Sequence, residues 1–146
     1  MNQIPNKTNA TLTYKDQYME QENSFTKAHL DNQLWLNELR FYREETEIFQ
    51  KHLEELIERN TSLQESDEAA FFQNQFVRIG DLVTNFENEL QSAQTKMAMY
   101  AKSDQSADLE NVIVADHFLF METLEGFKEE YEALKNKFKK FEAELY

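Results

Sequence analysis

Residues 72–86 read FQNQFVRIGDLVTNF, and five large apolar residues in this stretch recur at alternating steps of four and three. They are Phe72, Phe76, Ile79, Val83 and Phe86. A strand needs a period of two, whereas this 3.5-residue rhythm places all five side chains on one face of an α-helix. The same rhythm continues outward from Ala69 to Tyr100. The stretch therefore predicts a long amphipathic helix whose apolar face packs against other helices.

Two further segments repeat this rhythm, one from Trp35 to Leu56 and one from Ile113 to Leu145. Polar connections separate the three segments, and connections of this length usually join antiparallel neighbours. Two glycines and one proline in 146 residues also favour helices, because sheets and their turns need more of both. We expect an all-α fold, an antiparallel up-down-up three-helix bundle with long coiled-coil-like helices at about 24–60, 66–102 and 107–145.

The chain divides into a polar N-terminal extension, residues 1–23, and the bundle, residues 24–146. Tyr14 and Tyr18 continue the heptad phase of the first helix, so a helical continuation that overhangs its neighbours is one form the extension can take. Ser62 with Glu65, and Ser66 with the acidic residues after it, are two candidate start signals for the second helix.

Counting along the helices from their connections places Phe127 near Val83 and Tyr42. Gly80 and Gly126 lie inside the second and third helices, next to core positions. One interpretation is that these glycines let bulky aromatic side chains pack close to the backbone, and a kink or a functional notch is the alternative.

Composition and charge narrow the classes of function. Cysteine is absent, so the chain has no disulfide and no thiolate nucleophile. The net charge of −13 would repel nucleic acids and anionic lipid surfaces, so we expect neither as a partner. The first residues lack the basic start and apolar stretch of an export signal, and no apolar run approaches 18 residues. We expect a soluble, cytoplasmic protein.

A second apolar line lies beside the core positions of the first and third helices, and we call it the apolar flank. Its members are Leu34, Phe41 and Ile48 on the first helix, and Val112 and Leu119 on the third. Residues so apolar are poorly suited to open solvent. Either the N-terminal residues around Tyr14 and Tyr18 or a partner, most simply a second copy, is expected to cover the flank.

His117 and Asn32 interrupt the apolar core positions, and counting along the helices places both in one layer opposite the small Ala93. A buried polar layer of Asn32 and His117 specifies the register of the helices, because misaligned helices would leave these groups without partners. The alternative is a metal or proton site that uses His117 with His29 and Asp116 or Asp31.

No catalytic motif, glycine-rich phosphate loop or Glu-x-x-His pair occurs, so we expect no enzyme and no cofactor. The up-down-up order with Trp35 on the first helix resembles spectrin-type repeats in architecture, which by itself carries no function. The sequence favours a non-enzymatic interaction or scaffold protein that self-associates or binds a protein partner through the apolar flank. The alternative is a small-ligand or metal carrier built on the polar layer around His117.

Overall fold

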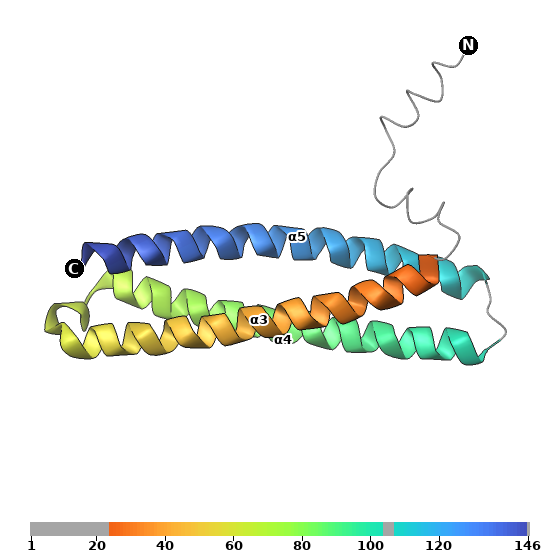
Figure 1. Cartoon of the computed structure of the whole chain (residues 1–146), viewed down its shortest axis with the longest axis horizontal. Coiled ribbons are helices and arrows are strands. Elements are labelled where there is room, and N and C mark those ends of the chain that lie inside the picture. The colour runs from red at the N-terminus through yellow and green to blue at the C-terminus, as the bar shows by residue number, and fades with distance from the viewer. Residues whose placement is uncertain (1–23, 104–106, 146) are drawn as a thin grey trace, which may run out of the picture. The chain divides into compact units, whose positions relative to one another are not determined.

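The computed structural model describes residues 24–103 and 107–145. The expectations for Tyr14, Tyr18 and the extension fall outside these residues. The fold is an all-α three-helix bundle, and no strand occurs in the described ranges. Its helices are α3 (Ser24–Arg59), α4 (Asp67–Lys102) and α5 (Ala107–Glu144), coloured orange to yellow, green and cyan to blue in Figure 1. The helix ends lie within one residue of the expected positions.

The connection between α3 and α4 contains a short 3₁₀ helix, η1 (Thr61–Leu63). The amide of Asn60 ends α3 by donating a hydrogen bond to the carbonyl of Leu56 at 2.8 Å. At the start of α4, the hydroxyl of Ser66 accepts a hydrogen bond from the backbone N–H of Ala69 at 3.2 Å. Ser62 lies inside η1 instead, so Ser66 is the start signal that the helix uses.

All three helices contribute residues to two compact units. Of the described residues, unit 1 comprises 24–33, 91–103 and 107–124, and unit 2 comprises 34–90 and 125–145. In unit 2 the ring of Phe72 packs 5.0 Å from that of Phe141, and Phe86 packs 5.3 Å from Phe127. Later residues of α4 therefore meet earlier residues of α5, as two antiparallel helices require.

The core of unit 2 is largely aromatic. Phe138 packs 5.0 Å from Phe76 and 5.5 Å from Phe49, measured between ring centroids. The predicted proximity of Tyr42 to Phe127 is confirmed, since their rings meet edge to face at 5.5 Å. Offset and edge-to-face pairs of this kind stabilise a core beyond the burial of their surface.

The interpretation of the two glycines as close-packing positions is wrong. A Cβ atom added to Gly80 or to Gly126 would meet no heavy atom of another side chain or helix within 4 Å. Packing in the described structure therefore does not require glycine at either position.

Polar pairs at seven-residue spacing join α3 to α5 in unit 2. Glu38 binds Lys128 at 2.9 Å, and Glu45 binds Lys135 at 3.0 Å. One heptad further on, His52 pairs with Glu142. Residue numbers rise together on both helices, so α3 and α5 run parallel here, and the three pairs fix their register.

The core of unit 1 is smaller. Ala28 of α3, Met97 of α4 and Ile113 of α5 are buried together. Three partly buried side chains, Phe25, Tyr100 and Leu109, pack against this cluster. Among the described residues, unit 1 therefore buries fewer large apolar groups than unit 2.

Candidate functional site

Two candidate sites follow from the sequence: the polar layer, which lies in unit 1, and the apolar flank. Asn32 of α3 and His117 of α5 are both buried in unit 1. Asn32 follows Ala28 by four residues, and His117 follows Ile113 by four, so each continues the core face of its helix. The 3.5-residue rhythm of the sequence thus carries two polar side chains into an otherwise apolar interior.

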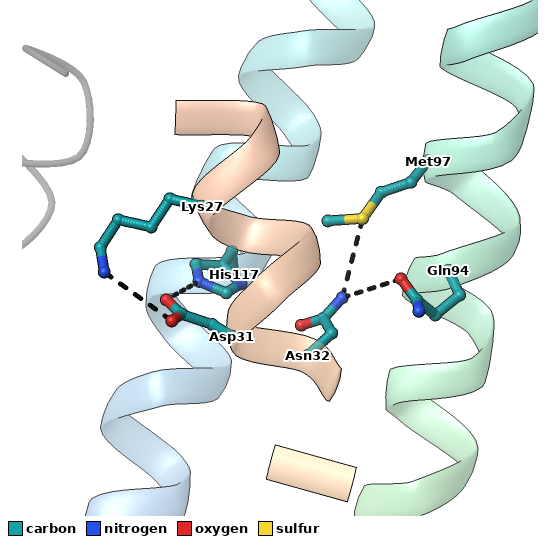
Figure 2. A network of polar contacts seen from close by, with 6 residues as sticks. All are labelled: Lys27, Asp31, Asn32, Gln94, Met97 and His117. Atoms are coloured by element: carbon teal, nitrogen blue, oxygen red, sulfur yellow. Dashed lines mark hydrogen bonds and ion pairs between the residues drawn. The ribbon is translucent and has the colours of Figure 1, made fainter. Parts of the chain in front are cut away.

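His117 forms a polar contact across to α3. Its Nε2 atom lies 3.1 Å from the Oδ2 atom of Asp31, and the side chain of His117 is only 3% exposed. Lys27, one helical turn before Asp31, places its ammonium group 3.7 Å from the other carboxylate oxygen. Figure 2 shows Asp31 between Lys27 and His117. The carboxylate therefore links an exposed cation to a buried imidazole.

Asn32 points toward α4 instead (Figure 2). Its amide donates toward Oε1 of Gln94 at 3.5 Å and toward the sulfur of Met97 at 3.8 Å. His29 Nδ1 also lies 3.3 Å from Oε1 of Gln94. The two polar residues of the predicted layer are thus held by different helices, Asn32 by α4 and His117 by α3.

Burial has a clear effect on the imidazole of His117. Desolvation lowers the pKa of His117 below its ordinary value of 6.5, and the hydrogen bond that its ring donates to the carboxylate of Asp31 opposes this without reversing it. The neutral imidazole is therefore the favoured form at neutral pH. With so little solvent access, His117 is better suited to holding α5 against α3 than to exchanging protons with a substrate.

The other residues of the predicted metal site lie apart. His29 contacts Gln94, and Asp116 forms an ion pair with Lys96 at 3.1 Å. Of the carboxylates considered, Asp31 is the one that meets His117. Within residues 24–103 and 107–145, no three histidine, aspartate or glutamate side chains gather closely enough to hold a metal ion.

The apolar flank has a clear geometry on α3. Leu34, Phe41 and Ile48 are 60%, 55% and 65% exposed, and all three belong to unit 2. Because they are seven residues apart, they form one row along the helix, which we call the outer row. Core residues Leu39 and Leu53 of the same helix are almost completely buried, so α3 has apolar side chains on two different faces.

The α5 members of the flank, Val112 and Leu119, lie in unit 1 and are 47% and 61% exposed. They too are seven residues apart and form one row on their helix. Large exposed side chains that recur at this spacing are unusual on a solvated helix face, where polar residues normally predominate.

The sequence reasoning missed the charged pairs between α3 and α5 because it did not compare the spacing of charged residues on different helices. A usable pattern was present: Glu38 and Glu45 are seven residues apart, as are Lys128 and Lys135. Opposite charges at heptad spacing are typical of pairs that flank a packed interface. In unit 2 the carboxylate of Glu45 also accepts a hydrogen bond from the hydroxyl of Tyr131 at 2.5 Å.

The chain matches no family model, no curated protein and no solved structure. Of the helices in the described part of the chain, none combines the length and apolar character that crossing a bilayer requires.

Proposed function

We propose that this protein is a non-enzymatic helical interaction module that binds a protein through the outer row of α3. The observation that carries the proposal is the exposure of Leu34, Phe41 and Ile48, each more than half open to solvent and regularly spaced along one helix. Isolated exposed apolar residues are ordinary on protein surfaces, but a row of three large ones at a single spacing is not.

The spacing also indicates the kind of partner. A second α-helix that packs along α3 meets side chains of one row every seven residues, so the outer row presents three successive layers to such a helix. Polar residues line the row on one side, with Asn37, Glu44 and Lys51 each three residues after an apolar member. An amphipathic helix that supplies apolar side chains and a polar rim is the partner chemistry that fits.

Site-specific photocrosslinking tests this proposal. The photoreactive residue benzoylphenylalanine, introduced at position 48, is expected to crosslink a protein in cells that make the chain. Position 77 is the matched control, because Val77 of α4 is 55% exposed but has polar residues or glycine three and four positions away on either side. Crosslinks at 48 that are absent at 77 would support the proposal. Equal crosslinking at both positions, or none at 48, would contradict it.

A further inference from the structure

The outer row has an arrangement that looks the same in both directions. Leu34, Phe41 and Ile48 are equally spaced, so reversing the helix again gives three large apolar residues at seven-residue steps. A second copy of α3 laid antiparallel on the first can therefore match every member of the row, with Phe41 against Phe41 and Leu34 against Ile48. Isologous contacts of this kind are the commonest way in which identical chains associate.

We infer that the partner of the outer row is a second copy of this chain, bound antiparallel with Phe41 at the twofold axis. This inference rests on the proposed function and names its partner. The outer row and the charged residues beside it on the same helix all lie in unit 2, on one uninterrupted stretch of α3.

Charge complementarity supports the antiparallel register. Arg40 and Glu44 are both exposed, and they lie on the same side of the outer row. When Phe41 faces Phe41, Arg40 comes opposite Glu44 of the second copy. The symmetry repeats this pair, so two oppositely charged contacts flank the central aromatic layer.

The opposite side of the row carries acidic residues that are already neutralised. Glu38 and Glu45 would face each other across the antiparallel interface, where two free carboxylates would repel. Within each chain, however, Glu38 binds Lys128 and Glu45 binds Lys135. The ion pairs between α3 and α5 therefore reduce the repulsion that would otherwise oppose association on this side.

A parallel arrangement fits less well. Residues of the same number face each other in a parallel helix pair, so Glu44 would meet Glu44 and Lys51 would meet Lys51 beside the apolar layers. Like charges held this close oppose association. The net charge of −13 acts against either arrangement, which makes the association weak and favours it at salt concentrations that screen the two chains.

Analytical ultracentrifugation of the full chain tests the inference, with protein from about 10 µM to about 1 mM in about 0.15 M salt, where exposed charges are screened beyond roughly 8 Å. The variants are Ile48→Glu, its matched control Val77→Glu, the single changes Arg40→Glu and Glu44→Arg, and the double change that swaps the two charges. Circular dichroism establishes that each variant keeps its helices, so that a lost dimer is not mistaken for a lost fold.

We expect a concentration-dependent dimer in the wild type. Ile48→Glu should weaken association at least about tenfold, a difference well within what interface substitutions produce, whereas Val77→Glu should leave it unchanged. Each single charge reversal should weaken the dimer, and the double change should restore it. A chain that stays monomeric throughout, or a double variant no better than the single ones, would overturn the inference.

Failure of this inference and failure of the proposed function have different signatures. A monomeric chain that still crosslinks a different protein at position 48 would overturn the second copy as the partner and leave the interaction module standing. A monomeric chain with no crosslink at position 48 would overturn both.

Discussion

The imidazole of His117 and the carboxylate of Asp31 lie 3.1 Å apart and join α5 to α3 in the interior of unit 1. Lys27 lies on the other side of Asp31, so a buried neutral group, an anion and an exposed cation follow one another in space. The position of His117 among apolar side chains determines how this arrangement responds to pH.

The first prediction is that acidification weakens the fold through His117. Because burial lowers the pKa of His117 from 6.5, the unfolded chain takes up this proton more readily than the folded chain. The stabilising contribution of the neutral imidazole is therefore present above pH 6.5 and is lost as the pH falls from 6.5 through the lower, folded pKa. Asp31 and Lys27 of α3 both act on the pKa of His117, and their electrostatic effects oppose each other.

Urea unfolding at pH 7.5 and at pH 5.5 measures this effect. The wild type should lose more stability between the two pH values than His117→Gln, which cannot be protonated in this range. The change in stability between the two pH values is compared for each protein, so the pH-independent cost of the substitution cancels. Equal pH dependence in the two proteins would show that His117 does not contribute.

The second prediction concerns the hydrogen bond from Tyr131 to Glu45 in unit 2. Tyr131 is buried, and its burial together with the carboxylate of Glu45 raises the pKa of the phenol well above its ordinary value. Tyr131→Phe keeps the ring but removes the donor to a charged acceptor, which should lower the free energy of unfolding by about 1.5 to 3 kcal/mol.

Tyr100→Phe is the matched control, because the hydroxyl of Tyr100 also donates to a carboxylate, that of Glu110 at 3.2 Å, at a more exposed site in unit 1. Chemical denaturation should show that Tyr100→Phe lowers the free energy of unfolding clearly less than Tyr131→Phe does. If both substitutions lowered the free energy of unfolding equally, burial would not explain the contribution of the hydrogen bond from Tyr131 to Glu45.

The third prediction is that Gly80→Ala and Gly126→Ala each stabilise the protein, by about 0.5 to 1 kcal/mol. Space for a Cβ atom is open at both positions, and alanine restricts the unfolded chain more than glycine does. Chemical denaturation of the two single variants and of the double variant measures the gain. A loss of stability at either position would mean that the helix needs glycine there for a reason other than packing.

The helices were predictable because a 3.5-residue rhythm over more than thirty residues has few other solutions. The contact of Tyr42 with Phe127 followed from counting residues outward from short connections, which determines how far along the bundle each residue lies. Depth along a helix is thus available from sequence alone.

The direction in which a side chain points around its helix was harder to obtain. Three helices in up-down-up order can be arranged with either hand, and the hand decides which neighbour a residue such as Glu38 or Asp31 faces. Asn32 and His117 illustrate this: the sequence gives their depth, but only the structure distinguishes the α4 partner of Asn32 from the α3 partner of His117. The interpretation of the two glycines was wrong for the same reason. The sequence places both glycines beside core residues, but it does not say in which direction a Cβ atom at either position would point.

The fourth prediction follows from the weak bonding of Asn32. Its side chain is almost completely buried, yet its observed hydrogen bonds are long, 3.5 Å to Gln94 and 3.8 Å to the sulfur of Met97. Asn32→Leu replaces a poorly bonded amide with an apolar group of similar size beside Met97. We therefore expect a gain of about 1 kcal/mol, because replacing a buried polar group with a well-packed apolar one is often stabilising.

Asn32→Ala separates the two contributions, since it removes the amide without filling the space and should destabilise the fold through the cavity it leaves. Both variants remove the contact between residue 32 and Gln94, and both keep the contact between Gln94 and His29. Any effect on Gln94 is therefore the same in the two variants. Thermal and urea unfolding of the two variants should therefore give changes of opposite sign. If Asn32→Leu were also destabilising by more than about 1 kcal/mol, the amide of Asn32 would be making a net contribution typical of a strong hydrogen bond, and the polar layer would stabilise the bundle as well as specify its register.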